Sequence, residues 1–315
     1  MKSTQPAIQS KGSPALLKKI LNAKYLYLML IIPVVYVLIF NYAPIGGIVM
    51  AFQRFSPRDG IFGSEWVGLY NFQRFFESPS FFDIMRNTLS ISLYSLIASF
   101  PFPILLAIMV NHCLLSHFKK AIQTITFAPY FLSTVLLVGL VTQVLSLRSG
   151  ILNLILEQFG CERVDFMGVP SLFNDIYVWT GIWQTTGYSA IIYISALAGV
   201  DPTYHESARI DGANIWQRIW HIDLATIRPT IVIMLILSMG SIINVDFERA
   251  FLMQNPINLS ASEIISTYVY KVSVATSRPD YSFGTAIGLF QNVITVILTL
   301  SVNKIVDKLT GEGMF

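Results

Sequence analysis

Several polar and aromatic side chains lie within, or at the ends of, long apolar stretches of this 315-residue sequence. They are Trp183, Gln184, Tyr188, Asn244, Asp246, Glu248, Arg249 and Asn292. Polar groups at membrane depth cost free energy and often mark the route of a solute. The set therefore predicts a solute path. Amides bind hydroxyls and aromatic rings stack on flat apolar faces, so Trp183, Gln184 and Tyr188 suit the chemistry of a sugar. The alternative is that these side chains join neighbouring helices by hydrogen bonds, and the sequence favours neither reading.

No residue pattern predicts catalysis or metal binding by this chain. The sequence lacks G-x-x-x-x-G-K-[ST], the loop with which a chain cradles nucleotide phosphates. His112 and His117 are five residues apart, and His205 and His221 are sixteen apart, but no cysteine or carboxylate completes a metal-ligand pattern with them. We therefore expect surface or interface histidines. No serine–histidine–aspartate arrangement can be read from the order of residues.

The composition indicates a chain whose surface largely avoids water. Hydrophobic residues make up 54% of it and charged residues only 12%, whereas a soluble domain usually carries about 25% charged residues. The net charge of +3 and the absence of a basic tract argue against nucleic acid as a partner.

Long gaps between charged residues predict the membrane-spanning helices, since a span needs about 20 mostly apolar residues. The runs are too long, and too apolar on all sides, for barrel strands. We therefore predict an all-α, polytopic membrane protein with about six transmembrane helices. The spans are placed near 26–50, 87–112, 122–146, 176–199, 229–249 and 281–303.

Basic residues predict the orientation, because loops on the cytoplasmic side are enriched in them. The segment 1–24 holds five lysines and no acid, and with the N-terminus inside, nine of the ten lysines lie on the inner side. A cleaved signal peptide is the alternative, but its apolar region is only about 7–15 residues long. We expect a cytoplasmic tail over 1–24, a transmembrane domain over 25–315, and both termini in the cytoplasm.

The inner segment 201–228 is more structured than a connector needs to be. Asp201 followed by Pro202 is a good helix start, with Thr203 and Glu206 at capping-box spacing as an alternative start. Gly212 can end this helix and Asn214 can cap a second one. The segment therefore predicts two short helices joined at a glycine.

The second of these helices carries an apolar stripe at helical spacing. The stripe consists of Ile215, Trp216, Ile219 and Trp220. One interpretation places this face in the lipid interface, where tryptophan is favoured. The other places it in a groove on a cytoplasmic partner. The residues alone do not decide between them.

The same segment resembles the EAA loop of ABC-importer permeases. The matching residues, in the order of that motif, are Glu206, Ala208, Asp211, Gly212 and Ala213, followed by Ile222, Leu224 and Pro229. Two positions depart from the family pattern: Ser207 replaces an alanine, and Ala225 stands where a proline is usual.

The resemblance covers residues 25–315. The strings Trp66-Val67-Gly68-Leu69-x-Asn71-Phe72 and Ile182-Trp183-Gln184-x-x-Gly187-Tyr188 are similar to MalF-type sugar permeases. The ending from Tyr281 to Phe290 looks like the LplB/YteP branch, which is associated with complex oligosaccharides. The resemblance thus implies a MalF/MetI-like ABC permease fold in a bacterial cytoplasmic membrane.

A subunit of this kind implies several partners and an alternating-access mechanism. They are a second homologous permease, two ATPase subunits that bind ATP and Mg, an extracellular solute-binding protein, an oligosaccharide substrate and membrane lipid. No cofactor is expected on this chain. The resemblance assigns ATPase coupling to the loop, and our candidates are Glu206, Ala208, Asp211, Gly212, Ala213, Trp216 and Ile219. Asp246, Glu248 and Arg249 could instead form a salt-bridged gate or a docking surface for the binding protein.

Two other classes of protein are consistent with a polytopic chain. An ion-gradient-driven secondary sugar transporter is favoured by inverted repeats, and none is visible here. A membrane-embedded enzyme needs a catalytic set within the spans, and none is visible either. The sequence does not name the sugar, its length or its charge.

Overall fold

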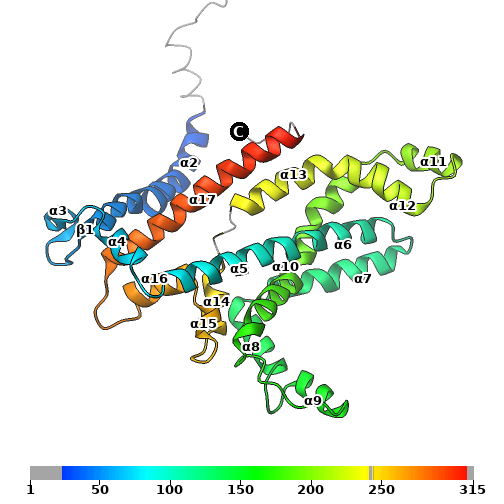
Figure 1. Cartoon of the computed structure of the whole chain (residues 1–315). Coiled ribbons are helices and arrows are strands. Elements are labelled where there is room, and N and C mark those ends of the chain that lie inside the picture. Colours follow the sequence, from blue (N-terminus) through cyan, green and yellow to red (C-terminus); the bar gives the residue numbers. More distant parts are fainter. Residues whose placement is uncertain (1–22, 241–242, 244, 311–315) are drawn as a thin grey trace, which may run out of the picture.

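A computed structural model describes residues 23–240, 243 and 245–310 of the chain. Most of the predicted tail 1–24, together with Asn244, lies outside the described residues. The prediction of an all-α membrane protein is confirmed, since β1 (Gln53–Arg54) and β2 (Glu65–Trp66) form the only sheet in the described ranges. Figure 1 shows long helices bundled side by side, with α11 and α12 at one end and α3, β1 and α16 at the other.

The helices follow one another along the chain with short connections. In order they are α2 (Lys24–Val37), η1 (Leu38–Tyr42), η2 (Ala43–Phe52), α3 (Gly60–Gly63), α4 (Tyr70–Phe76), α5 (Phe81–Ser99), α6 (Pro101–Asn111), α7 (Ser116–Phe127), η3 (Ala128–Phe131), α8 (Thr134–Val144), α9 (Ile151–Gln158), η4 (Pro170–Leu172), α10 (Phe173–Leu197), α11 (Pro202–Ile210), α12 (Ile215–Arg218), η5 (Ile219–Asp223), α13 (Leu224–Gly240), α14 (Phe247–Met253), α15 (Leu259–Ser262), α16 (Ile265–Ser273) and α17 (Tyr281–Thr310).

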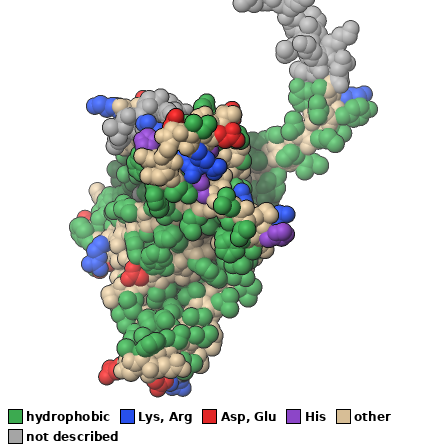
Figure 2. Space-filling view, turned by 90° about the vertical axis from the view of Figure 1, so that its right-hand side faces the viewer, with side chains coloured by type: hydrophobic (Ala, Val, Ile, Leu, Met, Phe, Trp, Pro, Cys, Tyr) green, Lys and Arg blue, Asp and Glu red, His purple; other side chains and the backbone are tan. Residues whose placement is uncertain are grey.

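By length and composition, four helices in the described residues can cross a bilayer. They are Lys24–Phe52, Phe81–Asn111, Ile215–Gly240 and Tyr281–Lys304, with the bent pair α7–η3 and α8 as a fifth candidate. Their outward side chains are apolar, and Figure 2 shows hydrophobic groups over most of the visible surface. Such a surface suits contact with lipid.

Helix α10, where the sequence predicts the fourth span, is long enough but more polar than these. Its 25 residues extend about 37 Å at 1.5 Å per residue, enough for a hydrocarbon core of about 30 Å. It packs against α5, α6, α7 and α13, and Tyr177, Thr180 and Tyr193 are buried among them. The face that its neighbours cover can therefore be polar, whereas its exposed face carries Trp179, Trp183, Ile191 and Ile192.

The third predicted span, 122–146, is not a continuous helix. It divides into α7–η3 and α8, which meet at an angle of 103°. Pro129 lies at the start of η3, and Leu132 and Ser133 adopt extended backbone conformations. The Ser133 hydroxyl accepts a hydrogen bond from the Leu136 amide and so caps the new helix. A proline and a capping serine end one helix and begin the next.

The fifth predicted span, 229–249, begins and ends elsewhere. The second helix of the inner segment does not stop, because α12, η5 and α13 form one helix over Ile215–Gly240 that runs through Pro229. The charged residues near 246–249 belong to a separate helix, α14, whose first turn is capped by Asp246. The predicted short second helix of the segment 201–228 and the predicted span bounds 229–249 are therefore corrected. One helix begins at Ile215 and ends at Gly240, and Asp246, Glu248 and Arg249 lie outside it.

The first helix of the inner segment begins and ends as predicted. The Asp201 carboxylate accepts a hydrogen bond from the Thr203 amide at 2.9 Å, and this bond lowers the pKa of the carboxyl below its ordinary value of 3.8. Gly212, with φ of +79°, ends α11, and the Ala213 amide donates to the Ala208 carbonyl to close the turn. Thr203 and Glu206 do not supply the cap.

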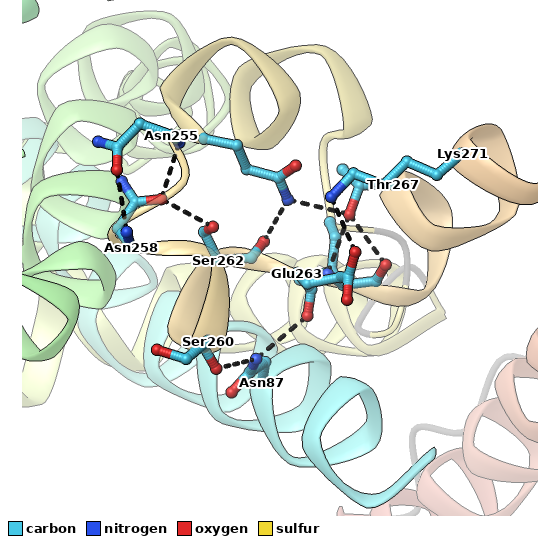
Figure 3. A network of polar contacts seen from close by, with 10 residues as sticks. Asn87, Asn255, Asn258, Ser260, Ser262, Glu263, Thr267 and Lys271 are labelled. Carbon is cyan, nitrogen blue, oxygen red and sulfur yellow. Dashed lines mark hydrogen bonds and ion pairs between the residues drawn. The ribbon is translucent and has the colours of Figure 1, made fainter. Parts of the chain in front are cut away.

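A polar network ties the connection between α14 and α16 to α5 (Figure 3). Asn258 is its centre: its amide donates to the carbonyls of Met167 and Met253, and its oxygen accepts from the Ser262 hydroxyl and the Asn255 amide. Asn87 on α5 donates to the carbonyls of Ser260 and Glu263. This network holds the start of α16 in place.

Replacing Asn258 by alanine should destabilise the protein by about 2 to 4 kcal/mol, because several buried polar groups lose their partners together. The thermal midpoint of the purified protein in detergent measures this loss. Ser260→Ala is the matched control, since the Ser260 side chain is exposed on the same connection. Equal midpoints for the two variants would contradict the central role of Asn258.

Acid should loosen the start of α11. The pKa of Asp201 is lowered in the folded state, so its contribution to helix stability is present above 3.8 and is lost as the pH falls through the lowered pKa. Amide hydrogen exchange at Thr203 and neighbouring residues should therefore accelerate in this acid range. Asp201→Asn keeps a capping oxygen that does not titrate, so exchange in this variant should lack that acceleration. Identical pH dependence in both proteins would refute the assignment.

Candidate functional site

A polar pocket of about 300 Å³ lies between α5, α10, α13 and α14. Its polar lining residues are Ser92, Ser95, Ser99, Tyr177, Thr185, Ser238, Asp246 and Arg249. Three of the serines come from one face of α5, at a spacing of three and then four residues. Hydroxyl groups therefore meet one carboxylate and one guanidinium in the middle of an otherwise apolar bundle.

Arg249 is the cation of this pocket. Its side chain is 13% exposed and its Nη2 lies 3.3 Å from Oδ2 of Asp246. The guanidinium lies over the ring of Tyr177, 4.7 Å from the ring centre, and beside Gly181, where a Cβ atom would collide with it. Its buried Nε has no hydrogen-bond partner among the described residues. A guanidinium has five N–H donors, so it keeps capacity for an acceptor that enters the pocket.

The structure brings together only part of the predicted solute path. Of the eight predicted residues, Asp246 and Arg249 line the pocket. Glu248, on the same helix, and Asn292, on α17, are exposed away from it, and Asn244 lies outside the described residues.

The aromatic and amide residues of α10 make other contacts. The Gln184 amide donates to the Leu132 carbonyl at the break between η3 and α8. Tyr188 stacks on Tyr130, with ring centres 3.9 Å apart. Trp183 is about half exposed and does not line the pocket. For Gln184 and Tyr188 the structure favours the alternative in which they join neighbouring helices.

Sequence reasoning missed the serines of α5. The signal was present, because Ser92, Ser95 and Ser99 recur at helical spacing in a span that is otherwise largely apolar. The signal is weak, because single hydroxyls are common in spanning helices, where they donate to their own backbone, as Ser92 does to the Thr88 carbonyl.

The residues predicted for ATPase coupling gather at one end of the molecule. Glu206, Asp211 and Gly212 are exposed on and just after α11, whereas Ala208 and Ala213 are partly buried in the turn. Glu206 makes no hydrogen bond within the described part of the chain, so its carboxylate is free to meet another molecule. Figure 1 shows α11 projecting at this end beyond the neighbouring helices.

The apolar stripe does not form one contact face. Ile219 packs against the buried cluster around Ala107 and Leu197, so it is a poor candidate for contact with a partner. Trp216 and Trp220 are exposed but line an apolar groove shared with α6. A role for Trp216 in partner contact remains a prediction.

Two histidines expected at the surface instead meet a buried carboxylate. Asp223 is fully buried, with His112 at 2.6 Å and His205 at 3.3 Å from its two oxygens. The three residues form no metal-binding group in the described structure. Since 111 residues separate His112 from Asp223, no local pattern could reveal this cluster. The only sequence signal is a carboxylate inside a helix that continues into a span.

Comparison with known proteins assigns the chain to a family. Residues 86–311 match the family described as binding-protein-dependent transport system inner membrane component. The chain is 39% identical to the polygalacturonan/rhamnogalacturonan transport system permease protein YteP of Bacillus subtilis, covering 95% of this chain and 93% of that one. It is 38% identical to protein LplB of the same species, covering 93% and 91%.

Solved structures agree with this assignment. A bacterial ABC transporter involved in the import of the acidic polysaccharide alginate matches with a TM-score of 0.86 and 36% identity, over 94% of this chain and 99% of that one. The same score, with 35% identity, holds for a bacterial alginate ABC transporter in complex with an alginate pentasaccharide-bound periplasmic protein. This chain therefore belongs to the family of binding-protein-dependent transport system inner membrane components, the permease subunits of ABC importers.

Proposed function

We propose that this chain is the permease subunit of an ATP-driven importer for acidic oligosaccharides, those that carry uronic acid carboxylates. The observation that carries the proposal is Arg249, a nearly buried guanidinium in a hydroxyl-lined pocket between the spans. The relatives named for polygalacturonan, rhamnogalacturonan and alginate handle polymers that contain such carboxylates, which supports the same substrate class here.

The pocket offers the two kinds of group that an acidic sugar needs. Serine and threonine hydroxyls can exchange hydrogen bonds with sugar hydroxyls. The guanidinium can bind a carboxylate through two parallel N–H donors, which is the strong geometry for this pair. Asp246 is paired with Arg249 at 3.3 Å and is 40% exposed, so water can solvate it when a substrate carboxylate takes its place. With one guanidinium, the pocket can bind the carboxylate of one sugar unit at a time as the oligosaccharide passes.

In this proposal, ATP hydrolysis on partner subunits that bind ATP and Mg drives transport. In this proposal α11 and the turn at Gly212 lie on the cytoplasmic side, together with both termini, and dock on an ATPase subunit. A second permease completes the path, and an extracellular binding protein delivers the sugar. Exposure of Glu206, Asp211 and the apolar side chains of Tyr204 and Ile210 supports docking at this end. Closure of the ATPase dimer then moves α11 and opens the permease pair outward.

Energy dependence separates this mechanism from an ion-gradient-driven transporter. Uptake of trigalacturonate should stop when ATP is depleted and continue when an ionophore collapses ion gradients. The reverse result would assign the chain to the secondary-transport alternative.

Replacing Arg249 by glutamine should lower uptake of trigalacturonate roughly ten- to hundredfold, because a charge-assisted hydrogen bond to the carboxylate is lost. Uptake of a neutral oligosaccharide of equal length, measured in the same proteoliposomes, should change little. Glu248→Gln is the matched control, since Glu248 is exposed on the same helix outside the pocket. Equal losses for acidic and neutral sugars would argue against carboxylate binding by Arg249.

Replacing Gly212 by valine should uncouple ATP hydrolysis from uptake while leaving the protein folded in the membrane. The backbone there has φ of +79°, which valine disfavours, but a Cβ would meet no atom within 4 Å. The change therefore alters the turn rather than the packing. Gly160→Val is the control, because Gly160 has φ of +76° and equally open surroundings at the end of α9. If Gly212→Val keeps the wild-type ratio of sugar taken up to ATP hydrolysed, this turn is not part of the docking surface.

A further inference from the structure

The cluster of His112, Asp223 and His205 joins three segments of the chain at the end that carries α11. His112 caps the C-terminus of α6, and Asp223 ends the widened turn η5 in the helix Ile215–Gly240. His205 lies on α11. Each histidine presents its Nε2 to a different oxygen of the same carboxylate, and the two rings meet edge to face with centres 5.9 Å apart.

The buried carboxylate of Asp223 opposes separation of the two histidines from it. Asp223 has no exposed surface, and a buried carboxylate without partners is costly, so it favours arrangements in which both oxygens are engaged. His112 Nε2 lies 2.6 Å from Asp223 Oδ2, and the two atoms share a hydrogen bond. Oδ1 makes no hydrogen bond in the described residues, and its ion-pair contact is with Nε2 of His205 at 3.3 Å.

Helix α11 has little else to hold it. None of its residues is buried, and it shares no extensive packing surface with another helix. Among the described residues, the contact of His205 with Asp223 is the only ion pair between α11 and the rest of the chain. Apart from its two covalent connections, α11 is therefore attached to the bundle mainly through His205.

We propose that His205 and Asp223 form the joint through which movement of α11 is transmitted to the second and fifth spans. The inference rests on the proposed function, in which α11 docks on an ATPase subunit. A pull on α11 acts on Asp223 through His205, and Asp223 is held in turn by His112 at the end of α6. The two contacts differ in length, 2.6 Å toward α6 and 3.3 Å toward α11, so the α11 side is the looser half of the joint.

The widened turn supports this role. Residues 219–223 form a turn with one more residue than an α-helical turn, a feature often found at functional sites. Asp223 ends this turn, and α13 continues from it into the fifth span. A displacement of Asp223 therefore reaches α13 directly through the backbone and α6 through His112. These residues position the spans and touch no substrate.

The test uses the whole importer, with its partner subunits and binding protein, in proteoliposomes with trigalacturonate as the probe. His205→Leu removes the contact and should lower the sugar taken up per ATP hydrolysed roughly tenfold, a size typical of coupling between sites. Assembly with the ATPase subunits and half-saturation by the loaded binding protein should not change. His205→Gln keeps an N–H donor where Nε2 lies and should restore most of the ratio, which a change in packing alone would not produce.

Two further variants complete the experiment. His117→Leu is the control, because His117 is exposed at the same end and makes no contact with Asp223. The double variant of His205→Leu with Asp223→Asn should lower the ratio of uptake to ATP hydrolysis no further than the more affected single variant does, since the two residues act as one unit. Should the leucine variant fail to assemble, Asp223→Asn alone, which keeps the side-chain shape, carries the same expectation of a lowered ratio.

The possible failures can be told apart. A wild-type ratio in both His205→Leu and Asp223→Asn, or additive losses in the double variant, would overturn the joint while leaving the proposed function intact. If uptake by the unmodified importer does not depend on ATP, the proposed function is overturned, and with it the role of α11.

Discussion

The lack of water in the hydrocarbon core constrains every part of this structure, because each backbone polar group there must find its partner within the protein. Continuous helices meet this requirement unaided, and they form the lipid-facing spans. Where the backbone departs from a helix, the protein supplies the partner. At the break between η3 and α8, Gln184 from α10 donates to the Leu132 carbonyl. The more polar helix α10 buries Tyr177, Thr180 and Tyr193 against its neighbours, and its exposed face carries large aromatic and aliphatic side chains.

The same constraint leaves few buried charged groups among the described residues. Arg249 lies in a hydroxyl-lined pocket between the spans, and Asp223 lies at the end of the bundle from which α11 projects. Each is a charged group that the fold accepts only with a partner, Asp246 for the first and two histidines for the second. We propose that the first exchanges its partner for a substrate carboxylate, and that the second links the helices that carry its partners. One chain thus uses buried charge in two ways.

Much of this could be predicted from local signals. Gaps between charges placed most of the spanning helices, and Asp201, Gly212 and Asn214 placed the caps of the inner segment, because each acts within a few residues. The break at Ser133 was not predicted, because spanning helices also tolerate proline and Pro129 alone therefore does not show where a span bends. The continuation of α12 through Pro229 and the separate helix α14 depend on packing between distant parts of the chain. The cluster at Asp223 was out of reach for the same reason: its partners come from α6 and α11, and only the folded chain brings them together.

The first spanning helix, Lys24–Phe52, differs from the others in how little of it contacts the rest of the protein. From Lys24 through Phe40 its side chains are exposed on all sides, and no other described element packs extensively against this half of the helix. Tilt and rotation of a span are set by the helices beside it and by its interfacial anchors. The described residues of the chain therefore do not set the tilt or rotation of this half, which depends on its interfacial anchors and on what surrounds it in the membrane.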